Sequence, residues 1–211
     1  MASGQTKHRI IQAAEQLFAT HGFVRASLRQ VTELAEVNLA SVNYHFGSKE
    51  NLVLEVFRRH LDGLNVEREK AFESVMNRST EQEPPTLSDL LTAFIAPALR
   101  LSTDPSQGEY FVQIVTRGYV EYKEELREFL AREYGDINRR FFAAIGKHLP
   151  HLPDEEVARR LDFTIGALTY SMGDFGMTKL TDGVDREAYL EATIESLVHF
   201  TQAGLIRSAT S

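Results

Sequence analysis

Apolar residues recur along this chain at intervals of three and four positions, the spacing that places them on one face of an α-helix. Ile10, Ala14, Leu17 and Phe18 form the first such face. No segment alternates apolar and polar residues in the manner of a half-buried strand. The pattern predicts an all-α protein of about nine helices, the later ones near residues 49–77, 86–101, 109–119, 120–148, 154–178 and 185–204.

Residues 27–49 are typical of two short helices joined by a tight turn. Ser27 begins the first helix and Gln30 follows at the capping-box spacing, in which each side chain satisfies a backbone N–H group of the other residue. Asn38 can cap the second helix, and Gly47 ends it. Helices this short cannot bury their apolar faces alone, so they must pack on the preceding helix. The pattern predicts a helix-turn-helix unit, whose second short helix enters the DNA major groove.

Residues 7–53 resemble the DNA-binding domain of the TetR family of bacterial transcriptional regulators. The resemblance lies in three segments that occur in the family's order: 10–23, 27–29, and Val42-Asn-Tyr-His-Phe-Gly-Ser-Lys-Glu-Asn-Leu52. It implies an N-terminal three-helix DNA-binding domain at residues 1–53. A larger helical ligand-binding and dimerisation domain would then occupy residues 54–211.

The charge distribution fits this division. The net charge of −7 disfavours a general polyanion-binding protein. Residues 1–50 nevertheless hold five basic side chains against four acidic ones, so the excess of acidic residues lies in the rest of the chain. A slightly basic head on an acidic body suits a protein that contacts DNA phosphates at one end only.

The second short helix, at residues 39–46, is expected to read DNA bases. Val42 and Phe46 lie four residues apart and should face the helical core, so Asn43 points outward. Its carboxamide can pair with N6 and N7 of adenine, or it can instead bind a phosphate or a water molecule. No Lys or Arg lies between Val37 and Phe46, so arginine readout of guanine from this helix is not expected. Specificity would then also come from apolar contact with thymine methyl groups and from DNA shape.

Other residues of the head are expected to hold the DNA backbone. Tyr44 and His45 match positions that touch the sugar-phosphate backbone in the family, although Tyr44 could instead be half-buried against the first helix. Lys49 lies in the first turn of the long helix, where backbone N–H groups also favour a phosphate. The full set of expected DNA-contacting residues is Ser27, Arg29, Asn38, Leu39, Ala40, Asn43, Tyr44, His45 and Lys49. Further positioning charge would come from Lys7, Arg9 or Arg25.

The helices near residues 154–178 and 185–204 are apolar on more than one face. Such a helix is either buried inside one subunit or shared with a partner. The resemblance implies a homodimer in which these two helices of each protomer form a four-helix bundle. The expected dimer contacts are Gly166, Ala167, Leu168, Leu190, Leu197, Phe200 and Ala203.

The resemblance also implies a cavity for a small-molecule effector in the C-terminal domain. Aromatic and methionine side chains are the candidates for its wall, although each could equally be core. Arg117 stands in an otherwise apolar run and needs either a structural carboxylate or an anionic ligand group as its partner. Residues 134–172 weakly resemble the subgroup of the family tied to fatty-acid metabolism, which implies an apolar effector. The expected effector-binding residues are Phe94, Phe111, Val115, Arg117, Tyr119, Phe141, Phe142, Tyr170, Met172, Phe175 and Met177.

Several classes of protein are disfavoured. The chain has no Cys, no Gly-rich phosphate loop and no Glu-x-x-His pair, so we expect no enzyme, no cofactor and no metal site. Pro150 separates His148 from His151 and prevents a shared helical metal face. The N-terminus lacks the apolar core of a signal peptide, and no apolar stretch is long enough to cross a bilayer. A cytoplasmic location and no membrane partner are expected.

The sequence therefore predicts a ligand-responsive transcriptional regulator, and a repressor rather than an activator. It would bind a palindromic double-stranded DNA operator as a homodimer, and a small apolar effector would alter its DNA affinity. The alternative is a DNA-binding regulator that a partner protein controls in place of a small molecule. An apolar cavity large enough for a ligand would distinguish the two.

Overall fold

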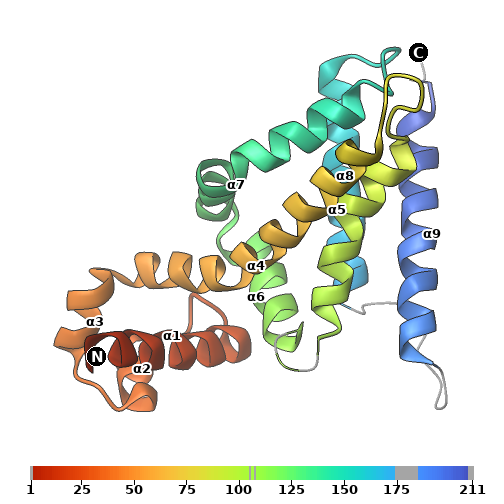
Figure 1. The fold of residues 1–211 in the computed structure, drawn as a ribbon. Coiled ribbons are helices and arrows are strands. Elements are labelled where there is room, and N and C mark those ends of the chain that lie inside the picture. Colours follow the sequence, from red (N-terminus) through yellow and green to blue (C-terminus); the bar gives the residue numbers. More distant parts are fainter. Residues whose placement is uncertain (1, 105, 107, 174–184, 209–211) are drawn as a thin grey trace. The chain divides into compact units, whose positions relative to one another are not determined.

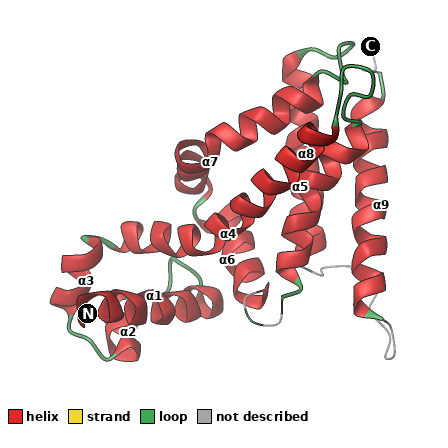
Figure 2. Ribbon diagram, in the orientation of Figure 1, coloured by secondary structure: helices red, strands yellow, loops and turns green. Residues whose placement is uncertain are grey.

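The computed structural model describes residues 2–104, 106, 108–173 and 185–208. Within these residues every regular element is an α-helix, and there are nine of them, α1–α9 (Figures 1 and 2). The predicted fold class and number of helices are confirmed. None of the helices in the described ranges is long and apolar enough to cross a membrane.

The first four helices are α1 (Ala2–His21), α2 (Leu28–Ala35), α3 (Leu39–Phe46) and α4 (Lys49–Arg78). Both predicted N-caps are present. The Ser27 hydroxyl oxygen accepts the Gln30 N–H, and the Gln30 side-chain oxygen accepts the Ser27 N–H at 2.8 Å. The Asn38 side-chain oxygen accepts the Ser41 N–H at 2.8 Å. These caps hold α2 and α3 in place although each helix has only eight residues.

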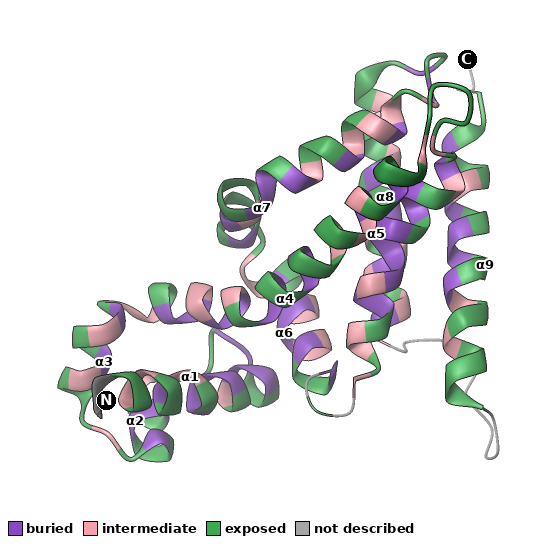
Figure 3. Ribbon diagram, in the orientation of Figure 1, coloured by how far each residue is buried: buried purple, intermediate pink, exposed green. Residues whose placement is uncertain are grey.

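The other helices are α5 (Leu87–Ser102), α6 (Gly108–Glu121), α7 (Lys123–Gly146), α8 (Asp154–Met172) and α9 (Arg186–Ile206). Thr86 and Asp89 form a second capping box at the start of α5. Asp185 caps α9 by accepting the N–H groups of Glu187 and Ala188. α5 contacts both α8 and α9 and is buried along much of its length (Figure 3).

Backbone contacts divide the chain into two compact units. The head unit contains Met1–Gly63 and Ser106–Glu133, and the body unit contains Leu64–Pro105 and Tyr134–Ser211. Helix α6 therefore packs with the helix-turn-helix segment, and α1 and α6 are in direct contact. The predicted domain boundary after residue 53 lies inside the head unit. The division into a DNA-binding domain and a ligand-binding domain stays a prediction.

The core of the head unit is aromatic. The Phe23 ring lies 5.3 Å from Phe18 and 5.2 Å from Phe57, measured between centroids. Tyr122, which follows α6, lies 5.3 Å from the same Phe23 ring. Tilted and edge contacts of this kind stabilise aromatic clusters beyond their buried area. The cluster thus joins α1 and the loop after it to α4 and to the residue that follows α6.

The body unit has a second aromatic cluster. The Phe141 ring of α7 lies 4.7 Å from Phe72 of α4 and 5.3 Å from Phe94 of α5, both in edge-to-face geometry. Phe141 is fully buried. The cluster therefore anchors three helices of the body unit to one another.

Candidate nucleic-acid interface and effector region

Helix α3 has one buried, apolar side and one exposed side. Val42 and Phe46 are buried, as their four-residue spacing predicts. Asn43 is exposed, and Tyr44 is 82% exposed, which excludes the half-buried packing considered for this tyrosine. Leu39 and Ala40 are also exposed. The predicted base-reading side chains thus lie together on the accessible surface of one capped helix.

The other predicted DNA contacts are partly engaged within the protein. The Ser27 and Asn38 side chains form the N-caps of α2 and α3. Arg29 Nε donates to Glu33 Oε1 at 2.9 Å, one helical turn away. The half-buried His45 ring lies 5.1 Å from the Tyr44 ring, edge to face. Because the Arg29 side chain is exposed, its surface ion pair is weak and leaves the guanidinium accessible to a phosphate.

Lys49 contacts the loop between α1 and α2. Its Nζ donates to the Val24 carbonyl oxygen at 3.3 Å. Lys7 forms an ion pair with Glu55 at 3.6 Å. Arg25 is exposed and forms no ion pair with any described residue. Of the basic residues expected to supply positioning charge, Arg25 is thus the most available to DNA.

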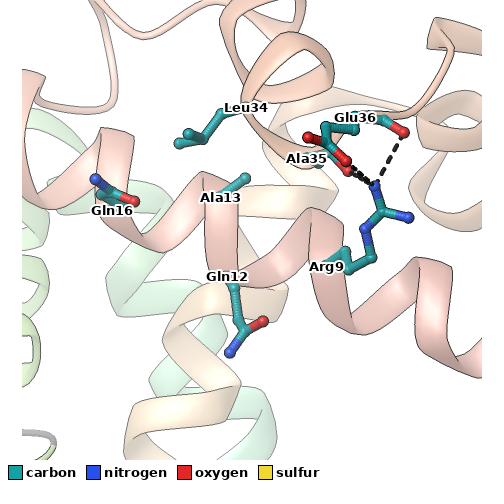
Figure 4. Close-up of a pocket in the computed structure, with 7 residues that line it drawn as sticks. All are labelled: Arg9, Gln12, Ala13, Gln16, Leu34, Ala35 and Glu36. Carbon is teal, nitrogen blue, oxygen red and sulfur yellow. Dashed lines mark hydrogen bonds and ion pairs between the residues drawn. The ribbon is translucent and has the colours of Figure 1, made fainter.

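Arg9 closes the C-terminal end of α2 (Figure 4). Its guanidinium donates to the carbonyl oxygens of Ala35 and Glu36 and lies 3.4 Å from the Glu36 carboxylate. Glu36 caps α2 in the left-handed conformation, with φ 49°. The last carbonyl groups of a helix have no hydrogen-bond donor within the helix, and Arg9 is the donor for these two. A shallow hollow of about 210 Å³ beside this contact is lined by Arg9, Gln12, Ala13, Gln16, Leu34, Ala35 and Glu36.

Arg117 has a structural partner. Its guanidinium donates to the carbonyl oxygens of Ala19 and Thr20 at 3.0 and 3.2 Å, and to the Glu121 carboxylate at 3.3 Å. The structural carboxylate is therefore present, and α6 is tied to the end of α1. A hollow of about 460 Å³ at this contact is lined by Thr20, His21, Val24, Arg25, Arg117 and Glu121.

The predicted effector residues belong to both units. In the body unit, Phe94 lies 5.3 Å from Phe141 and 6.1 Å from Phe142. Phe111 and Val115 are buried in the head unit, where the Phe111 ring lies 6.3 Å from His60. The remaining members are exposed Tyr119, exposed Tyr170 and buried Met172, while Phe175 and Met177 lie outside the described residues.

One residue of the body cluster was not predicted. The Arg68 guanidinium lies 4.0 Å from the centre of the Phe94 ring, and Arg68 Nε donates to the Phe94 carbonyl oxygen at 3.1 Å. Arg68 continues the helical stripe that runs from Leu64 to Phe72, and that spacing is the signal that could have identified it. The body cluster of Phe72, Phe94, Phe141 and Phe142 thus has two cations against it, because the Arg140 guanidinium lies 4.8 Å from the centre of the Phe72 ring.

The predicted dimer residues fall into two groups. Leu168 and Leu197 are buried within the protomer, so their area already serves the core of the body unit. Gly166, Phe200 and Ala203 are exposed, and Ala167 and Leu190 are half-buried. Phe163 of α8 was not among the predicted dimer residues, yet it is 68% exposed, and Phe200 of α9 is 70% exposed. Between these two rings lies a hollow of about 160 Å³, lined by Arg160, Phe163, Thr164, Phe200, Thr201, Gly204 and Leu205.

Comparison with known families agrees with this arrangement. Residues 10–56 match the family described as "Bacterial regulatory proteins, tetR family". Residues 92–204, more than half of the chain, match "Tetracyclin repressor-like, C-terminal domain". The chain belongs to the TetR family. Both families describe regulators, which confirms the prediction that the chain is not an enzyme. Among the described residues no cluster of three or more His, Cys, Asp or Glu could hold a metal ion.

Individual relatives are more distant. The probable HTH-type transcriptional regulator YttP of Bacillus subtilis is 31% identical over 78 residues, which is 37% of this chain and 38% of YttP. NalD of Pseudomonas aeruginosa, described as the secondary repressor of the MexAB-OprM multidrug efflux pump, superposes over the whole of both chains with a TM-score of 0.66 and 20% identity. The fatty acid degradation regulator FadR of Bacillus halodurans superposes over 95% of this chain and 96% of its own, with a TM-score of 0.62 and 19% identity. The two structures share the fold with this chain.

Proposed function

We propose that this TetR-family protein is a transcriptional regulator that binds operator DNA through α3. The observation that carries the proposal is the exposed face of α3, where Asn43 and Tyr44 project from a capped helix whose opposite side is buried. A rigid helix with a free carboxamide and a free phenol is suited to the major groove. The proposed set of DNA contacts is completed by six residues that lie close to these two in the sequence: Ser27, Arg29, Asn38, Leu39, Ala40 and His45.

A homodimer is the proposed active form. Phe163 and Phe200 are exposed on neighbouring helices. Large aromatic side chains stabilise a protein most when they are removed from water, so both rings would be stabilised by contact with a second copy of the chain. Small residues beside them, Gly166 and Ala203, allow a second copy to approach closely. A two-fold dimer reads a palindromic operator, since each protomer takes one half-site. Repression in place of activation is supported by the description of NalD as a repressor.

The proposed effector is a small apolar molecule bound in the body unit. The cluster of Phe72, Phe94, Phe141 and Phe142 supplies an apolar wall, and Arg68 supplies one cation beside it. This combination suits a ligand with an apolar chain and an anionic end, a description that fatty acids meet. A partner protein that replaces the effector is the second candidate. It is favoured by the complete burial of Phe141, whose ring is in contact with Phe72 and Phe94.

Selection of bound fragments from genomic DNA tests the DNA-binding proposal. The purified protein should enrich a palindromic site at fixed salt. Asn43→Ala should bind the same site with lower affinity and relaxed preference at one position of each half-site, by about 1–3 kcal/mol. Asn77→Ala is the matched control, because Asn77 is an exposed residue at the end of α4. Failure of the wild-type protein to enrich any sequence would contradict the proposed function.

The addition of candidate ligands distinguishes control by a small-molecule effector from control by a partner protein. Dodecanoate should raise the melting temperature of the protein and change its affinity for the selected site, because a ligand that binds the folded state stabilises it. Dodecanol, which has the same chain and lacks the carboxylate, should have a smaller effect if Arg68 receives the anionic end. No change with either compound would favour control by a partner protein.

A further inference from the structure

The Val24 peptide in the loop between α1 and α2 is held from two sides. Its N–H donates to Glu121 Oε2 of α6 at 3.1 Å. Its carbonyl oxygen accepts a hydrogen bond from Lys49 Nζ, in the first turn of α4, at 3.3 Å. The Val24 side chain is 69% exposed and contributes little packing of its own. Two charged side chains from other helices therefore hold this loop, in addition to the buried Phe23 ring.

Arg117 places Glu121 for this role. It binds the carbonyl oxygens of Ala19 and Thr20 in the last turn of α1, and it also donates to Glu121 Oε1. One carboxylate thus bridges Arg117 and the Val24 N–H. Hydrogen bonds with an ionised partner are shorter and stronger than neutral ones, so this bridge is well suited to fix a loop.

The backbone at Gly22 is shaped around the same carboxylate. Gly22 has φ +85°, and a Cβ atom built on it would lie 2.5 and 2.8 Å from the two Glu121 carboxylate oxygens. Any side chain at this position would displace Glu121. This close approach is independent of the hydrogen bonds, and it indicates that the turn and the carboxylate are matched to each other.

We propose that Glu121 is a positioning residue for DNA binding, which acts by holding the Val24 N–H group and not by touching DNA. This inference rests on the proposed function. Val24 lies three residues before Ser27, the N-cap of α2, and α2 packs on α3. A fixed loop therefore sets the orientation of the recognition helix before DNA binds. If the loop were freed, DNA binding would have to order it again, and the lost conformational entropy would weaken the affinity.

The sign of the Glu121→Ala effect on DNA affinity tests the proposal. Loss of a negative charge from a DNA-binding unit strengthens phosphate attraction, so electrostatics alone predicts equal or tighter binding. The positioning role predicts binding weaker by at least about fivefold. Glu128→Ala is the control, since it removes the same charge from an exposed position of the head unit. Glu121→Ala binding as tightly as Glu128→Ala would overturn the proposal.

Two further measurements separate positioning from misfolding. Glu121→Gln keeps an oxygen that can accept the Val24 N–H, so it should recover part of the DNA affinity lost in Glu121→Ala. Hydrogen exchange at the Val24 amide should be slow in the wild type and fast in Glu121→Ala, with or without DNA. Fast exchange in the wild type would refute the loop contact itself. Slow exchange in a protein that selects no DNA would instead refute only the proposed function.

Discussion

His60 Nε2 of α4 lies 2.6 Å from Glu15 Oε1 of α1, and both side chains are buried in the head unit. Arg59 approaches the other Glu15 oxygen at 3.6 Å, His8 of α1 also interacts electrostatically with Glu15, and the Phe111 ring of α6 lies 6.3 Å from the His60 ring. Burial raises the pKa of the Glu15 carboxyl group. The interactions with His60, Arg59 and His8 outweigh burial, so the pKa lies below its usual value of 4.5.

A lowered pKa makes the stability of the head unit depend on pH. The stabilisation from Glu15 is complete above pH 4.5, and it is lost as the pH falls through the lower pKa of the folded protein. Glu15→Gln should lower the free energy of unfolding by about 2 kcal/mol at pH 7. Urea unfolding should show this difference shrink as the pH falls below 4.5. Glu67→Gln, in an exposed pair with Lys70, should change stability by less than about 1 kcal/mol, and an equal effect of both variants would contradict the prediction.

Gly22→Ala should destabilise the protein by about 2 kcal/mol, because it combines a positive φ with a clash against the Glu121 carboxylate. Gly63→Ala is a matched control: Gly63 lies within helix α4, and a Cβ atom there meets nothing within 4 Å. This control should stabilise by about 0.5–1 kcal/mol, since alanine favours the helix. Thermal unfolding of the two variants should therefore shift in opposite directions. A shared direction would show that the Gly22 turn tolerates a side chain.

Glu36→Gly should stabilise the protein. Glu36 occupies the left-handed region, which costs an L-residue roughly 1–2 kcal/mol and glycine almost nothing. The Arg9 hydrogen bonds to the Ala35 and Glu36 carbonyl oxygens do not need the Glu36 side chain, so they persist. We expect a gain of about 1 kcal/mol in denaturant unfolding. Glu33→Gly, inside α2, should instead lose about 1 kcal/mol, and a loss in both variants would sink the prediction.

Phe200→Glu should convert a dimer to a monomer at micromolar concentration, because it places a charge in the proposed apolar interface. Sedimentation should show a fall in mass, with circular dichroism unchanged since Phe200 is exposed in the protomer. Val66→Glu places the same charge on an exposed position of α4 and should leave the mass unchanged. A wild-type protein that is already monomeric would rule out the interface.

Local signals were reliable wherever a neighbouring residue in the sequence decides the outcome. The caps at Ser27 and Asn38 were predicted because their partners lie three residues away. The burial of Val42 and Phe46 followed from their spacing on one short helix. The exposure of Tyr44 was open, since a side chain at the edge of the apolar face can turn either way.

Long-range partners could not be predicted in the same way. The need of Arg117 for a partner was evident from its apolar neighbours, but the Ala19 and Thr20 carbonyl oxygens lie nearly one hundred positions earlier in the chain. The burial of Leu168 and Leu197 within the protomer depends on how α8 and α9 meet α5. Spacing shows that a helix has two apolar faces, and it does not show which face the same chain covers.

The amino-acid sequence alone determined the helical class, the helix-turn-helix caps, the polar face of α3 and the family, because each depends on residue types at short, fixed spacings. The tertiary structure decided that α6 packs with the head, that Glu121 and Lys49 hold the Val24 peptide, and that Glu15 meets His60. These pairings join residues distant in the chain. They arise only when packed helices bring the side chains within hydrogen-bonding distance, and no local pattern records that geometry.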